Sequence, residues 1–117
     1  MRTIIAGSRG VNNMETLELA MSKCGWTPTV VLCGMAKGAD RMGRLWAQKR
    51  GIPVEEYPAR WLEHGKAAGM IRNRLMAEKG EALVALWDGE SRGTKNMIDL
   101  AYRKGLHVYE HLVVTIH

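Results

Sequence analysis

The chain has 117 residues, a formal net charge of +5 and an apolar fraction of 46%, which fits one domain with its own hydrophobic core. It contains no run of eighteen apolar residues, which excludes a membrane-spanning helix, and no low-complexity tract or like-charge block typical of a linker or disordered tail. The positive charge favours anionic partners, namely nucleotides, nucleic acid or phosphorylated metabolites, without choosing among them.

The two cysteines, Cys24 and Cys33, stand apart, and neither belongs to a zinc-binding spacing. We therefore expect no disulfide and no metal site, with Cys33 in the core at the end of a strand. The short apolar run at residues 3–6 is interrupted too early for a signal peptide, so the expected compartment is the cytoplasm.

Strands and helices are expected to alternate along the chain. In order, the patterns predict a strand at 2–6, a helix at 14–23, a strand at 29–32, a helix at 41–50, a strand at 53–57, a loop or helical turn at 58–66, a helix at 67–79, a strand at 82–87, a helix at 94–104 and a strand at 106–109. Residues 112–116 either prolong the last strand or form a short edge strand. Leu45 and Leu75 belong to the apolar stripes of their helices.

This alternation predicts right-handed βαβ units, and hence a single three-layer Rossmann-like α/β domain over residues 1–117. Its sheet is expected to be mostly parallel, with about five strands. Ligands of such sheets bind outside the carboxyl ends of the strands, where the strand order reverses. All the strand-to-helix turns lie at that edge.

Three of those turns combine glycine with small polar or charged residues, at 7–10, 33–40 and 88–94. Glycine lets a ligand approach the backbone closely, and the first N–H groups of a helix can bind an anion. The loops on the opposite edge carry only helix-stop signals. The asymmetry favours a phosphate- or nucleotide-binding edge over a set of ordinary tight turns.

The two best-known nucleotide motifs are absent. Without G-x-G-x-x-G, a conventional NAD-dependent dehydrogenase is disfavoured, and without G-x-x-x-x-G-K-[ST], so is classical NTP hydrolysis. His64 is the histidine expected nearest the ligand edge, but no catalytic triad can be assembled around it.

Three other side chains have two interpretations each. Arg9 either holds a phosphate with two hydrogen bonds or is a solvated loop arginine. Arg72, followed by Asn73, either reaches a phosphate or ribose or belongs to a basic solvent face. Trp61 either stacks on a base or packs its loop onto the core.

Taken together, four segments resemble the small YspA/YpsA-type branch of the SLOG superfamily. They are Gly7-Ser8-Arg9, the run 33–40, the segment 69–76 and the stretch 87–94. The resemblance implies a Rossmann-like domain that binds a nucleotide or nucleotide-derived ligand. Relatives include the Lonely-guy phosphoribohydrolases, the DNA-processing protein A of transformation, and sensor domains for NAD-derived signals. The resemblance also leads us to expect a homo-oligomer.

The resemblance and the turns together define the expected nucleotide-binding residues. The second turn is expected to form one wall of the pocket, and the helix start after the third turn is expected to hold a phosphate. Arg72 falls at the position of the functional arginine of the phosphoribohydrolases. The set comprises Gly7, Ser8, Arg9, Gly34, Met35, Lys37, Gly38, Asp40, Arg72, Asn73, Asp88, Gly93 and Thr94.

One position departs from the enzymes of this superfamily. Their P-G-G-x-G-T-x-x-E motif ends in a glutamate, whereas this chain has Met97, which carries neither charge nor proton. We therefore predict a binding protein, a sensor or sequestering module without a bound cofactor. The alternatives are a nucleoside monophosphate N-glycosidase, with Asp40, Arg72 and either Asp88 or Glu90 as its catalytic candidates, and a nucleic-acid-binding protein.

Overall fold

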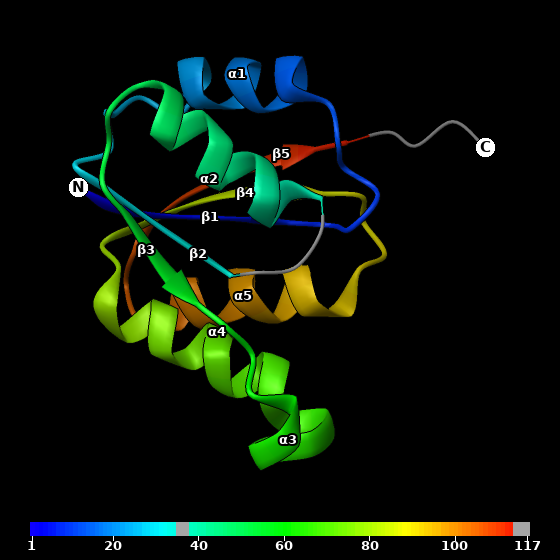
Figure 1. The fold of residues 1–117 in the computed structure, drawn as a ribbon. Coiled ribbons are helices and arrows are strands. Elements are labelled where there is room, and N and C mark those ends of the chain that lie inside the picture. Colours follow the sequence, from blue (N-terminus) through cyan, green and yellow to red (C-terminus); the bar gives the residue numbers. More distant parts are fainter. Residues whose placement is uncertain (35–37, 114–117) are drawn as a thin grey trace.

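The computed structural model describes residues 1–34 and 38–113, which form a five-stranded sheet between two layers of helices (Figure 1). The strands are β1 (Arg2–Gly7), β2 (Val30–Gly34), β3 (Val54–Tyr57), β4 (Ala82–Trp87) and β5 (His107–Leu112). The helices are α1 (Met14–Lys23), α2 (Ala39–Lys49), α3 (Trp61–His64), α4 (Ala68–Lys79) and α5 (Arg92–Arg103), with a 3₁₀ turn η1 (Gly65–Ala67) before α4.

All neighbouring strands pair in parallel, in the order β3-β2-β1-β4-β5. The chain therefore adds strands on one side of β1 and then crosses to the other side with β4. The strand order reverses between β1 and β4, which is where ligands bind in this class of sheet. The predicted α/β fold with a parallel sheet is confirmed, and the sheet is parallel throughout.

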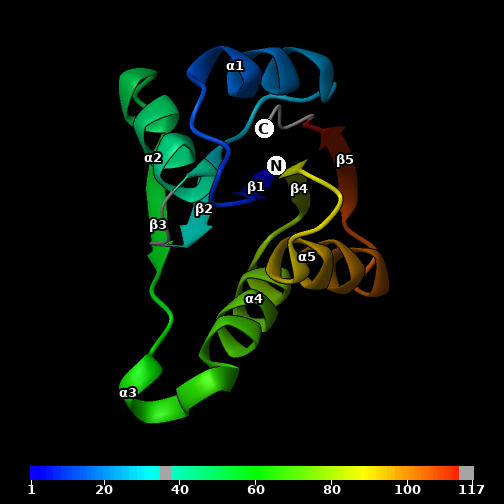
Figure 2. The ribbon, with the colours of Figure 1, turned by 90° about the vertical axis from the view of Figure 1, so that its right-hand side faces the viewer.

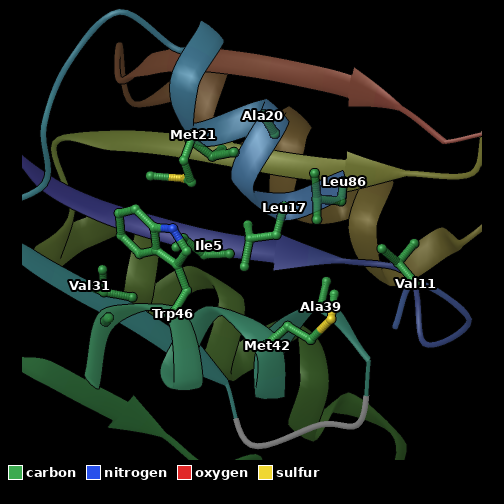
Figure 3. Packing of buried hydrophobic residues seen from close by; sticks show 12 residues of the cluster. Ile5, Val11, Leu17, Ala20, Met21, Val31, Ala39, Met42, Trp46 and Leu86 are labelled. Atoms are coloured by element: carbon green, nitrogen blue, oxygen red, sulfur yellow. The ribbon is translucent and has the colours of Figure 1, made fainter. Parts of the chain in front are cut away.

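Alternate residues of the central strands supply two core layers, because successive side chains point to opposite faces of a sheet. Ile5 and its neighbours on one face pack with Leu17 of α1 and Trp46 of α2 (Figure 3). Ile4 and Leu83 on the other face pack with α4 and α5. β4 is buried on both sides, as its continuous apolar run predicts.

The edge strands and the connection after β3 complete the layout. β5 continues past residue 109 to Leu112, the first residue of the stretch 112–116, while residues 114–117 lie outside the described part of the chain. The connection 58–66 contains the helical turn α3 and the start of η1. None of the described helices is long and apolar enough to cross a bilayer.

Two leucines of the predicted apolar stripes are not in the core. Leu45 and Leu75 remain 43% and 46% exposed. In α4 the position facing α5 belongs instead to Asn73, which is only 7% exposed. Helical spacing alone indicates which residues share a face, and the packing against the neighbouring elements decides which face is covered.

Gly43 sets the distance between α2 and the sheet. A Cβ built on it would lie 2.8 Å from Cγ2 of Ile5, too close for an ordinary contact. In α4, a Cβ built on Gly69 would lie 3.7 Å from the ring of Trp61, a normal contact distance. The same substitution at these two helical glycines should therefore have opposite effects.

We expect Gly43→Ala to lower the free energy of unfolding by about 1–2 kcal/mol, because overpacking outweighs the gain in helix propensity. Gly69→Ala should raise it by up to about 1 kcal/mol. Urea denaturation of both variants beside the wild type measures the two shifts. Equal stabilisation by both substitutions would contradict the tight α2–β1 contact.

Candidate functional site

A cleft of about 820 Å³ lies at the carboxyl edge of the sheet, where the strand order reverses. It is bordered by the turn after β1, the start of α2, the connection between β3 and α4, the inner face of α4, and the turn that leads from β4 into α5. The predicted residues that line it are Gly7, Ser8, Arg9, Asp40, Arg72, Asn73, Asp88, Gly93 and Thr94.

Four predicted residues are not part of that lining as the described residues define it. Met35 and Lys37 lie outside the described part of the chain. Gly34 makes room for protein atoms, because a Cβ built on it would lie 2.6 Å from Oδ2 of Asp40 and 2.8 Å from Cζ of Arg72. Gly38 precedes α2 with a φ of +82°, and a Cβ there would lie 2.8 Å from the carbonyl carbon of Arg9.

Arg72 is held in place on the wall of the cleft. Its Nη1 donates a hydrogen bond to the carbonyl of Tyr57 at 3.3 Å, and its Nε donates to Oδ1 of Asn73 at 3.0 Å. Nη1 also lies 4.0 Å from Oδ2 of Asp40, and the two side chains are only 14% and 9% exposed. The solvent-face interpretation is therefore wrong for Arg72, although it holds for the exposed Arg74 two residues on.

Asn73 joins α4 to α5. Its Nδ2 donates to the carbonyl of Gly93 at 3.2 Å and to Oδ1 of Asn96 at 3.0 Å, while its Oδ1 accepts from Arg72. An asparagine amide has two N–H donors, and both are used within the protein. Asn73 therefore borders the cleft mainly as a residue that positions Arg72 and the first turn of α5.

The turns after β1 and β4 are tied to each other. The N–H of Ser8 donates to the carbonyl of Leu86 at 3.0 Å, and the N–H of Asp88 donates to Oγ of Ser8 at 3.2 Å. Ser8 is 2% exposed, so this link is shielded from water. Arg9 follows it at the exposed rim of the cleft.

Asp88 and Ser91 build the start of α5. Oδ1 of Asp88 accepts from the N–H groups of Ser91 and Glu90, both at 2.8 Å, and these bonds hold the pKa of Asp88 below its usual value. Ser91 caps the helix by accepting from the N–H and hydroxyl of Thr94. Apart from its chain neighbours and the backbone of its own helix, no described atom lies within 4 Å of a Cβ built on Gly93, so there is open space beside the first turn of α5.

Sequence reasoning missed several parts of the lining. Ser91 caps α5, which begins at Arg92 and not at the predicted Thr94, and Lys66 lines the cleft from a connection that has no periodic pattern. Trp61, for which the sequence left two interpretations, lines the cleft and is 55% exposed, so it does not pack its loop onto the core. Met97, at the position of the enzymes' glutamate, is 1% exposed and lies at the base of the cleft.

Neither His64 nor Cys33 belongs to this lining. His64 is exposed on α3, 3.7 Å from a carboxylate oxygen of Glu63. Cys33 is fully buried, as predicted, and burial raises the pKa of its thiol to about 12, which keeps it protonated at neutral pH. Within residues 1–34 and 38–113, no three His, Cys, Asp or Glu side chains are grouped to hold a metal ion.

We expect Asn73→Ala to lower the free energy of unfolding by about 1–3 kcal/mol, because it removes the three hydrogen bonds of a buried amide. Asn12→Ala, which changes an exposed asparagine in the loop before α1, is the matched control and should have little effect. Chemical denaturation monitored by circular dichroism gives both values. Equal stabilities of the two variants would rule out a structural role for this amide.

Comparison with known proteins gives three similarities. Residues 1–64 match the family described as the YspA, cpYpsA-related SLOG family. The chain is 34% identical over 119 aligned positions to the Gene 61 protein of Mycobacterium phage D29, covering 92% of this chain and 93% of that protein. The fold resembles DNA processing protein A (DprA) from Streptococcus pneumoniae with a TM-score of 0.76, at 17% identity over 93% of this chain, which spans about half of the DprA chain.

Proposed function

Because the chain belongs to the YspA, cpYpsA-related SLOG family, we propose that its cleft binds a nucleotide or nucleotide-derived ligand, as a sensor or sequestering module. The observation that carries the proposal is the convergence of Arg72, the turns after β1 and β4, and the open start of α5 on one cleft. These elements are far apart in sequence. They meet only because the strand order reverses between β1 and β4.

The cleft offers groups for each polar part of such a ligand. Guanidinium groups bind phosphate through charge-assisted hydrogen bonds, which suits Arg72 on the wall and Arg9 at the rim. Ser91 accepts from the N–H groups of Thr94 and Lys95, so the N–H groups of Arg92 and Gly93 at the start of α5 are a second anion-binding element, with space beside Gly93. Carboxylates accept hydrogen bonds from ribose hydroxyls, a role that fits Asp40 and Asp88.

The carboxylates also bear on the choice of ligand class. Asp40 and Asp88 line the same cleft as the arginines, and their negative charge opposes the close approach of a continuous phosphate backbone. A compact ligand with one anionic part and several hydroxyl groups satisfies both kinds of residue. The cleft therefore favours a small nucleotide over a nucleic acid strand.

We expect Arg72→Ala to weaken the binding of AMP by about 10- to 100-fold, the loss typical of a charge-assisted hydrogen bond. Arg74→Ala removes the same charge from the exposed face of α4 and should leave the affinity within about twofold. Isothermal titration calorimetry at fixed ionic strength measures both. Equal weakening by the two variants would indicate a general charge effect instead of a site.

A second candidate function rests on the Asp40–Arg72 pair, which places a carboxylate and a guanidinium 4.0 Å apart on the cleft wall. Such a pair can assist cleavage of an N-glycosidic bond. Met97, however, lies buried at the base of the cleft and offers no acid, base or charge. Binding without turnover is therefore the favoured function.

Incubation of the protein with AMP should release no adenine above the uncatalysed rate, as followed by liquid chromatography. Asp40→Asn serves as the control for any trace release, because a contaminating enzyme would be unaffected by the change. Release that the wild type supports and Asp40→Asn abolishes would make the protein an N-glycosidase.

A further inference from the structure

The cleft has two chemically different ends. The turns after β1 and β4 and the start of α5 supply hydroxyl, carboxylate and backbone groups at one end. The connection from β3 to α4 supplies a largely apolar end, where Pro58, Ala59, Trp61, Gly69 and Met70 line the cleft together with the single charged residue Lys66. The sheet order separates the two ends, because β4 and β3 lie on opposite sides of β1. Arg72 lies on the wall they share and bonds to Tyr57 at the end of β3.

Trp61 is the largest side chain of the apolar end, and its exposure calls for an explanation. It lies on α3, which Figures 1 and 2 both place apart from the sheet, before the start of α4. It is 55% exposed and joins neither core cluster of the described residues. The outer edge of its ring lies over Gly69, where a Cβ would be 3.7 Å from Cη2. The position is supported by α4 while much of the indole remains open.

From this arrangement we propose that Trp61 is the base-recognition residue of the cleft, on which the nucleobase of the bound ligand stacks. The inference rests on the proposed function. It assigns a binding place to the nucleobase, for which the described residues of the polar end offer no partner. Aromatic stacking accepts any base, because every base presents a flat ring face. The ligand therefore spans the cleft, with its anionic part toward Gly93 and its heterocycle against the indole.

The test compares ligands that differ only in the base. AMP, GMP and UMP carry the phosphate and ribose of ribose 5-phosphate and add a flat heterocycle. We expect the wild type to bind at least one of them about 5- to 100-fold more tightly than ribose 5-phosphate, the range typical of one stacked base. Isothermal titration calorimetry under one buffer condition gives each affinity.

Substitutions at Trp61 should change only the part of the affinity that the base contributes. Trp61→Ala should remove most of the preference for the nucleotides while leaving the affinity for ribose 5-phosphate within about twofold. Trp61→Phe keeps a flat ring and should retain much of the preference. Leu62→Ala, at the fully exposed neighbour in the same helical turn, is the matched control and should change neither affinity. Circular dichroism confirms that each variant remains folded.

The outcomes separate this inference from the proposed function. Equal wild-type affinity for the nucleotides and ribose 5-phosphate would overturn the base-stacking role while leaving phosphate binding in the cleft. A preference that survives Trp61→Ala, or a variant that loses both kinds of ligand equally, would overturn it as well. Failure of every phosphorylated probe to bind the wild type would overturn both.

Discussion

The buried amide of Asn73 is the interaction on which the candidate site depends. It holds the guanidinium of Arg72 through its oxygen and the first turns of α5 through its nitrogen. Each partner alone would be an ordinary feature: a helix arginine and a helix start. Because a buried amide leaves few arrangements that satisfy all of its hydrogen bonds, it places the two in a defined relation. The cleft has its shape because α4 and α5 meet at this point.

Glycines support the same arrangement by admitting protein atoms. Gly34 lets Arg72 and Asp40 cross the end of β2, and Gly38 lets the backbone of Arg9 pass beside the start of α2. In both places a side chain would displace a wall of the cleft. Glycines in turns at a ligand edge are commonly expected to make room for the ligand. These two instead make room for other parts of the protein, which brings functional groups together.

Much of the fold follows from local sequence patterns. The continuous apolar run of β4 and the alternation of strands and helices predict a buried parallel sheet, and the structure has one. The buried Cys33 at the end of β2 also follows from its pattern. The exposed Leu45 and Leu75 do not, because helical spacing defines a stripe without stating which neighbours will cover it. The lining role of Lys66 had no local signal at all.

The amino-acid sequence by itself therefore determined the element order, the parallel sheet and the edge at which the polar turns gather. These properties depend on periodicity and on residues close together in the chain. Tertiary structure alone decided that the side chain of Arg72 is shielded from solvent, that Asn73 hydrogen-bonds to other residues of the protein, and that Trp61 remains exposed at the end of the cleft. Each of those outcomes depends on contacts between residues distant in sequence, whose distances and burial exist only once the strands and helices have packed.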